Sequence, residues 1–227
     1  MSAALEVILP VFLVIAAGWA CTRAGIVTSE IVDGLMRFAQ GVAVPVLLAQ
    51  RIGKLDLAAS FDLKLFASFY SGAFVAFGLG FAGARWLGRP ATEAVAIGFA
   101  AMFSNSLLLG VPITERAYGT EALAGNFAII AIHSPLFYGF GIALMEWART
   151  RGQGLSGAAL LRQIVTAIFS QPLVLGITAG FAVNLSGLPL PGVAWSAIGM
   201  VAGTAIPTAL FGLGGVLLRY KPDGDFR

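Results

Sequence analysis

Charged residues, cysteine and histidine are all scarce in this sequence of 227 residues. Only 11% of the residues are charged, whereas about a quarter are charged in soluble domains. The single cysteine, Cys21, excludes an internal disulfide, and one cysteine with one histidine, His133, gives no support for a metal site. We therefore expect no metal and no cofactor. Hydrophobic residues make up 58% of the chain, so a lipid bilayer is its expected solvent.

Long apolar segments recur along the chain. A transmembrane helix needs about 20 mostly apolar residues, and seven segments approach or exceed this length. Glycine and proline within them are tolerated in membrane helices, where neighbouring helices satisfy the freed backbone groups. The sequence therefore predicts an all-α polytopic membrane protein with seven transmembrane helices. These helices are expected at residues 5–22, 33–51, 63–85, 91–113, 121–147, 163–184 and 193–218.

Basic residues are distributed unevenly between the two sides of this predicted bundle. The positive-inside rule places the side with more basic residues in the cytoplasm. This predicts an external N-terminus and a cytoplasmic connection at residues 149–162, with the protein in the inner membrane. Because the basic residues are dispersed between spans, a nucleic-acid partner is not expected. One side has Arg51, Lys54, Lys64 and Arg116; the other has Arg23, Arg37, Arg85, Arg89, Arg149, Arg151, Arg162, Arg219, Lys221 and Arg227.

An internal repeat relates the beginning of the chain to its end. At an offset of 162 residues, 12 identities fall within the 44 positions from 10 to 53, without a gap. Glycine and proline account for half of the matches, and chance similarity between apolar helices explains such matches poorly. The unit that repeats contains five spans, an odd number, so its second copy enters the membrane from the opposite side. The pattern predicts an inverted repeat, which is typical of secondary transporters.

The repeat also predicts the domain organisation. Residues 1–148 form the first five-helix repeat, residues 149–162 the linker, and residues 163–227 the first two helices of an incomplete second repeat. A complete second copy would need about three more spans, so the chain is expected to be a fragment or a natural truncation.

A polar interruption stands out in the fourth predicted span. Ser104, Asn105 and Ser106 are followed by Gly110 and Pro112 within an otherwise apolar segment. Proline removes a backbone donor, while Ser and Asn cap new helix starts. The pattern is consistent with a broken helix whose terminus binds an anion at mid-membrane. A simple proline kink with serines bonded to their own helix explains it equally well from the residues alone.

The stretch Ser-Asn-Ser-Leu-Leu-Leu-Gly-Val-Pro, followed by Tyr118 and Gly119, resembles the Asn-x-x-x-x-Gly-x-Pro motif of the auxin efflux carrier family. This family includes plant PIN carriers and bacterial malonate or malate permeases. The resemblance implies ten spans in two inverted repeats, with broken fourth and ninth spans crossing at the substrate. It also implies that Asn105 faces the substrate and that Gly110 and Pro112 shape the crossover. The second crossover would fall 162 positions after Asn105, beyond the last residue.

Three further residues are candidates for functional roles. His133, near the middle of the fifth span, is either a proton-coupling residue or a neutral histidine bonded across helices. Pro45 and Pro207 occupy equivalent repeat positions and are expected to bend the helices that frame the crossover. Small residues four apart in the last two spans allow close helix packing, with a homodimer as the minor alternative.

The function predicted from these features is secondary active transport of a small organic anion, such as a dicarboxylate, by alternating access. The coupling ion, H⁺ or Na⁺, is left open. A channel and a non-transporting truncated protein are the alternatives. An intramembrane enzyme is less consistent with the sequence, because a hydrolase has no need of a repeated pair of broken helices.

Overall fold

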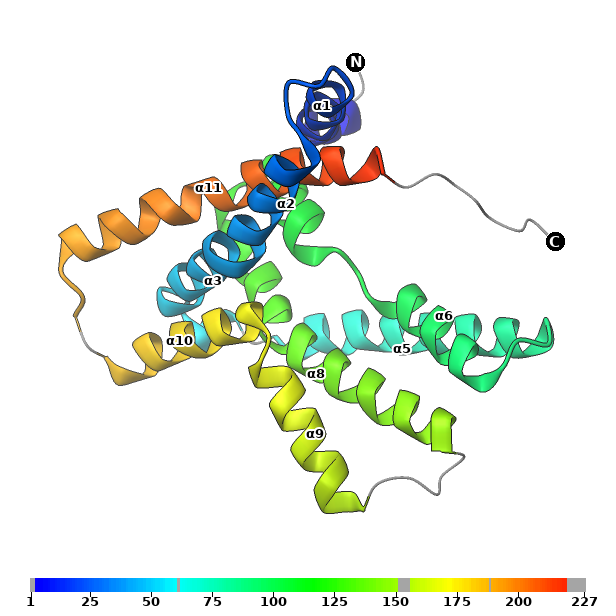
Figure 1. The fold of residues 1–227 in the computed structure, drawn as a ribbon. Helices are drawn as coiled ribbons and strands as arrows, with labels where there is room; N and C mark the ends of the chain where they lie inside the picture. Colours follow the sequence, from blue (N-terminus) through cyan, green and yellow to red (C-terminus); the bar gives the residue numbers. More distant parts are fainter. Residues whose placement is uncertain (1–2, 61, 151–155, 188, 220–227) are drawn as a thin grey trace. The chain divides into compact units, whose positions relative to one another are not determined.

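All elements in the described part of the chain are helices (Figure 1). The computed structural model describes residues 3–60, 62–150, 156–187 and 189–219. Lys221, Arg227 and residues 151–155 of the predicted linker, which include Arg151, lie outside these ranges. The elements are α1 (Ala3–Arg23), α2 (Ser29–Phe38), η1 (Ala39–Ala43), α3 (Val44–Gly53), α4 (Leu57–Ser60), α5 (Leu63–Trp86), α6 (Ala91–Met102), η2 (Ser106–Gly110), α7 (Val111–Tyr118), η3 (Thr120–Ala122), α8 (Leu123–Thr150), α9 (Gly157–Phe169), α10 (Pro172–Ser186) and α11 (Gly192–Leu217).

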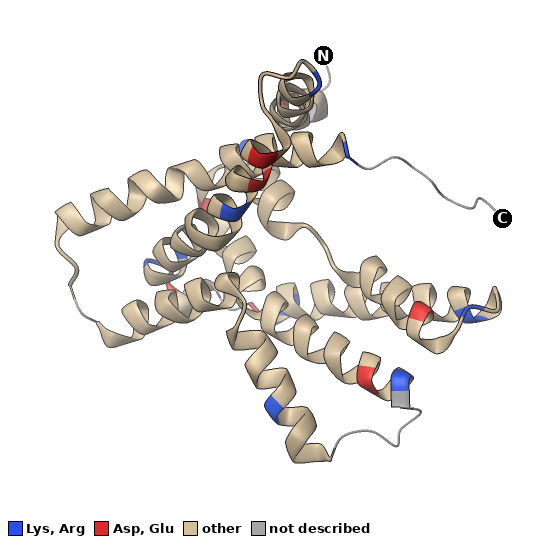
Figure 2. Cartoon of the chain, in the orientation of Figure 1, with Lys and Arg blue, Asp and Glu red and all other residues tan. Residues whose placement is uncertain are grey.

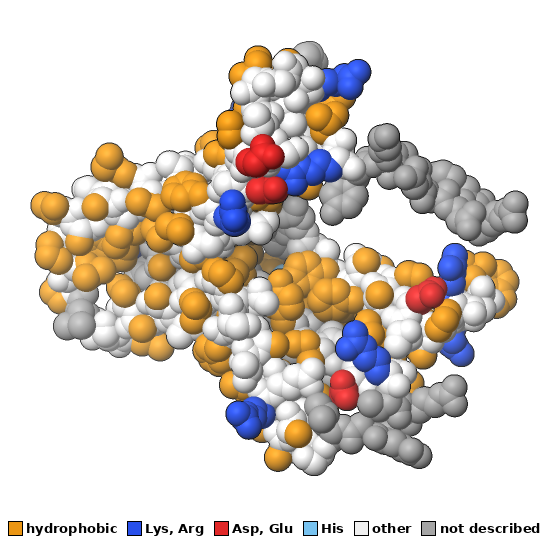
Figure 3. Space-filling model, viewed as in Figure 1, with side chains coloured by type: hydrophobic (Ala, Val, Ile, Leu, Met, Phe, Trp, Pro, Cys, Tyr) orange, Lys and Arg blue, Asp and Glu red, His pale blue; other side chains and the backbone are white. Residues whose placement is uncertain are grey.

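Six helices or contiguous helix groups are long and apolar enough to cross a membrane, and a bent helix pair brings the count to seven. This confirms the predicted polytopic helical fold. Figure 2 shows that charged residues are sparse along these helices, and Figure 3 shows hydrophobic side chains over much of the visible surface. Large apolar side chains such as Leu79, Val193 and Met200 are exposed, as expected for helices that face lipid.

The sixth predicted span differs from the expectation of one continuous helix at residues 163–184. The segment consists of α9 and α10, which are bent by 81° relative to each other. Helix α9 begins at Gly157, where the Ser156 hydroxyl caps it by accepting a hydrogen bond from the Ala159 amide. The bend falls at Ser170 and Gln171, before Pro172, whose predecessor is disfavoured in helical conformation. The sequence did not predict this break, because the segment is apolar on both sides of it.

The helices group into two compact units, which are described separately. Unit 1 comprises residues 1–54, 107–123 and 176–227, and unit 2 comprises residues 55–106 and 124–175. The chain therefore passes between the units four times, and neither unit coincides with one predicted repeat. The predicted repeat boundaries remain a prediction.

In unit 1, helix packing is reciprocal at the repeat offset of 162 residues. A Cβ atom on Gly18 of α1 would collide with the backbone of Phe211 in α11. At the equivalent positions, a Cβ atom on Gly180 of α10 would lie 3.1 Å from the carbonyl oxygen of Ala49 in α3. The turns that follow α1 and α10 also match, because Gly25 and Gly187 have positive φ values of 72° and 63°. Two-fold related helix pairs would produce contacts of this kind.

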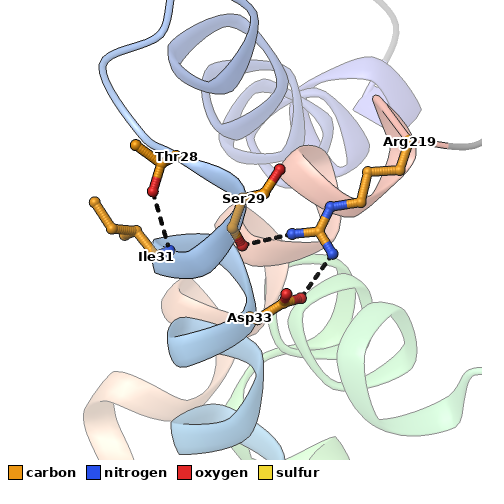
Figure 4. A network of polar contacts seen from close by, with 5 residues as sticks. All are labelled: Thr28, Ser29, Ile31, Asp33 and Arg219. Atoms are coloured by element: carbon orange, nitrogen blue, oxygen red, sulfur yellow. Dashed lines mark hydrogen bonds and ion pairs between the residues drawn. The ribbon is translucent and has the colours of Figure 1, made fainter.

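Polar contacts extend this reciprocal packing to the helix ends. Near the end of α11, Arg219 donates to the Asp33 carboxylate at 2.7 Å and to the Ser29 carbonyl at 2.6 Å (Figure 4). In the other direction, the Lys54 ammonium after α3 lies 4.5 Å from the ring centre of Trp195 near the start of α11. Asp33 and Trp195 are equivalent positions in the repeat. The second span of the first predicted repeat runs from α2 to α3, and that of the second repeat is α11. The start of each of these two spans therefore contacts the end of the other.

Unit 2 is built from close helix contacts and aromatic rings. Helices α5 and α6 approach closely where Gly80 meets Gly98, because a Cβ atom on Gly80 would lie 3.1 Å from the Cα atom of Gly98. Helix α9 packs on α8, where Ile164 and Ile168 would contact a Cβ atom on Gly139 at 3.5 and 3.6 Å. These contacts pair α5 with α6 and α8 with α9.

Candidate functional site

The fourth span is interrupted where the sequence predicted a break. Helix α6 ends at Met102, and Phe103 has an extended backbone with φ −83° and ψ 101°. Residues 103–105 have no regular secondary structure, and a π-helix begins at Ser106. Because an interrupted helix leaves N–H and C=O groups without helical partners, the break creates polar backbone inside an apolar span.

Three polar side chains lie at this interruption, two within it and one on the first residue of the π-helix that follows. The hydroxyl oxygens of Ser104 and Ser106 lie 2.6 Å apart and share a hydrogen bond. Ser104 and Asn105 are exposed, and Ser106 is half-buried. Two hydroxyls and a side-chain amide on consecutive residues offer several donors within a short segment, which is the chemistry that an oxyanion requires.

Gly110 and Pro112 belong to unit 1, whereas Ser104, Asn105 and Ser106 belong to unit 2. The π-helix η2 precedes Pro112, and its wider turn relieves the clash between the proline ring and the preceding turn. Leu108 and Leu109 pack against a buried cluster of Val11, Ile15 and Leu210. The segment after the break is therefore held against α1 and α11. The role of Gly110 and Pro112 in shaping a crossover stays a prediction.

The two proline positions expected to frame the site differ in their local structure. The π-helix η1 precedes Pro45, and the Val44 amide donates to the carbonyl of Ala39, five residues earlier. Pro207 lies inside α11, which continues as an α-helix from Gly192 to Leu217. The helix of Pro45 is therefore locally widened, whereas a bend at Pro207 stays a prediction.

His133 is buried in unit 2 beside the residue that precedes the break. Its side chain is 3% exposed, and its ring centre lies 4.7 Å from Phe103, 4.4 Å from Phe137 and 5.6 Å from Phe69. Among the described residues, neither Nδ1 nor Nε2 has a hydrogen-bond partner. Buried polar atoms are usually paired, so an unpaired imidazole within an aromatic cluster calls for a functional explanation.

The aromatic cluster around His133 was not anticipated from the sequence. Three helices of unit 2 contribute rings to it: Phe69, Tyr70, Phe74 and Phe77 from α5, Phe99 from α6 with Phe103 at its end, and Phe137, Tyr138 and Phe140 from α8. The signal was present in the third span, where aromatic residues recur every three or four positions and therefore share one helix face. In an apolar span this periodicity is inconspicuous, because every face is hydrophobic.

The helices and the interrupted span define the class of this chain as a polytopic membrane protein with polar backbone in its fourth span. The sequence matches the family described as "Membrane transport protein" over residues 3–226, and the chain belongs to this family. It is also similar to a protein of Methanothermobacter thermautotrophicus described as an uncharacterized transporter, with 27% identity over 215 residues. That match covers 92% of this chain and 66% of the relative, so the chain spans just under two thirds of the relative's length. The family is one of transport proteins, not of enzymes.

Proposed function

We propose that this chain acts in secondary active transport of a small organic anion, such as a dicarboxylate, with Asn105 at the substrate site. The observation that carries the proposal is the helix interruption at residues 103–105 within an apolar span of a transport-family protein. Non-helical backbone at membrane depth persists only where it is buried in protein or lines a cavity. A substrate pathway is the simplest reason to retain it.

The chemistry at the interruption favours an anion. The Asn105 amide can donate to carboxylate oxygens, and so can whichever of the Ser104 and Ser106 hydroxyls accepts the hydrogen bond between them. A helix also begins at Ser106. Charged side chains are not required for this, since backbone N–H groups and the helix dipole supply partial positive charge. In a low-dielectric site such donors discriminate strongly, because any donor left unpaired on binding costs free energy.

The reciprocal contacts of unit 1 support the alternating-access part of the proposal. Transporters with inverted repeats expose a fixed site alternately because their halves exchange conformations. The pairing of Gly18 with Phe211 and of Gly180 with Ala49 is what such a two-fold relation would produce. Each span of one repeat would therefore cross the membrane in the direction opposite to its equivalent in the other repeat.

His133 is proposed to couple transport to protons. The ring stands against Phe103, and both of its nitrogens lack partners among the described residues. A histidine can change its charge near neutral pH, and ionisable residues inside membranes are commonly functional. Sodium remains the alternative coupling ion, and sodium-driven uptake that ignores a pH gradient would assign the coupling to it.

The proposal is tested by flux in proteoliposomes that contain the full chain. We expect malonate or malate uptake that saturates and is inhibited by competing dicarboxylates. Asn105→Ala should reduce uptake at subsaturating substrate by about tenfold, the effect of losing roughly 1.4 kcal/mol of hydrogen bonding. Ser71→Ala is the matched control, because Ser71 is an exposed residue of α5 whose hydroxyl donates to the Ser68 carbonyl within the same helix.

Two results would contradict the proposal. Uptake that rises linearly with concentration and ignores competitors would indicate a channel. Equal substrate affinity in the Asn105→Ala and Ser71→Ala variants would remove Asn105 from the site.

A further inference from the structure

A mostly apolar cleft of about 430 Å³ lies within unit 2, between α6, α8 and α9. Its volume is within the range of ligand pockets, about 300–1,000 Å³. Val95, Phe99, Ile142 and Met145 supply apolar walls, while Glu146 and Arg149 lie at the end of α8. Figure 2 shows an acidic and a basic residue near this end of the helix. The cleft is separate from the Ser104–Ser106 interruption.

The walls of the cleft are fixed by close packing. A Cβ atom on Gly141 would lie 2.6 Å from the ring of Phe99, so the absence of a side chain allows this ring to lie against α8. On the other side, α9 is held on α8 through the contacts of Ile164 and Ile168 at Gly139. The cleft is therefore a product of the way three helices pack.

The dimensions of the cleft suit an acyl chain in one leaflet. Its lining on α8 runs from Tyr138 to Arg149, which corresponds to about 16 Å at 1.5 Å per residue. Half of the hydrocarbon core of a bilayer is about 15 Å. Because the lining ends one residue before the end of α8, the charged residues lie where a transmembrane helix reaches the polar interface.

We propose that this cleft binds one membrane phospholipid with a zwitterionic headgroup that carries a primary ammonium. An acyl chain would occupy the apolar walls, the Arg149 guanidinium would bind the phosphate, and the Glu146 carboxylate would attract the ammonium. Arg149 and Glu146 are three residues apart on one helix and therefore on one face. Their opposite charges match such a headgroup better than a purely anionic one, because Glu146 repels net negative charge.

Lipid retention by the full chain tests this assignment. The purified protein is delipidated in detergent, incubated with phosphatidylethanolamine, phosphatidylcholine or phosphatidylglycerol of equal chain length, and examined by native mass spectrometry. We expect phosphatidylethanolamine to be retained as one molecule per chain and to bind more tightly than the other two. Preference for phosphatidylglycerol, or equal retention of all three, would overturn the proposal.

Variants locate the bound lipid. Ala96→Leu places a larger side chain in the cleft and should abolish the retained molecule, whereas Ala82→Leu, on an exposed position of α5, should not. Arg149→Gln should weaken retention about tenfold, compared with no change for Arg162→Gln, which removes a basic residue outside the cleft. Glu146→Gln should remove the preference for phosphatidylethanolamine over phosphatidylcholine.

Retention that is equal in Ala96→Leu and Ala82→Leu would show that the lipid binds elsewhere. The readout involves no transport, so it is independent of the proposed transport function.

Discussion

The close packing of equivalent glycines in unit 1 predicts that Gly18→Ala and Gly180→Ala both destabilise the protein. A Cβ atom on Gly18 would lie 2.8 Å from the carbonyl carbon of Phe211, and ordinary contact begins at 3.4 Å. The obstacle is backbone, so it cannot rotate away as a side chain could. On Gly180 the added atom would meet the Ile52 Cβ atom at 2.8 Å. In both cases two helices have to separate.

The magnitude follows from two opposing effects. Overpacking of a close contact costs about 1–3 kcal/mol, while replacing glycine by alanine inside a helix contributes up to about 1 kcal/mol of helix propensity. We expect a net loss of about 1–2 kcal/mol in the free energy of unfolding. For a chain of this length each kcal/mol corresponds to roughly 2–4 °C, so the melting temperature should fall by about 2–8 °C.

Thermal unfolding in detergent, followed by intrinsic tryptophan fluorescence, measures this effect. Gly72→Ala in α5 and Gly203→Ala in α11 are the controls, because a Cβ atom at either position meets nothing within 4 Å. Both controls should keep or raise the melting temperature. If Gly18→Ala and Gly180→Ala behaved like these controls, the helices would not be in contact at the two glycines, and the reciprocal packing would be refuted.

Two further predictions concern charge and protonation. His133→Gln should flatten the dependence of uptake on pH in proteoliposomes, and an unaltered pH profile would exclude proton coupling through this residue. Arg219→Gln should lower the free energy of unfolding by less than about 1 kcal/mol, because the side chains of Arg219 and Asp33 are 36% and 53% exposed. If Arg219→Gln and Asp33→Asn lower the melting temperature equally, and the variant with both changes shows no further decrease, the loss of the ion pair accounts for the decrease in each variant.

The helical membrane fold was largely accessible from the sequence, because the length of the apolar segments reports directly on helices that can cross a membrane. The break at Asn105 was accessible for the same reason, since polar residues followed by glycine and proline contrast with an apolar background. The bend before Pro172 was not, because Ser170 and Gln171 resemble the polar residues that membrane helices tolerate. The aromatic surroundings of His133 were hidden because they depend on which faces of α5, α6 and α8 meet.

The boundaries between the two units fall at or near the ends of helices. The chain passes between the units after Lys54, after Ser106, after Leu123 and after Leu175. The passage after Lys54 lies one residue beyond the end of α3, and the passages after Ser106 and Leu123 lie at the starts of η2 and α8. The passage after Leu175 lies one helical turn into α10, just after the 81° bend. An uninterrupted α-helix resists bending because its backbone hydrogen bonds would have to break, whereas non-helical or π-helical residues absorb changes in φ and ψ. In the proposed function, the interruption at Asn105 supplies the polar groups for the substrate, and its residues lie where the chain passes from unit 2 to unit 1.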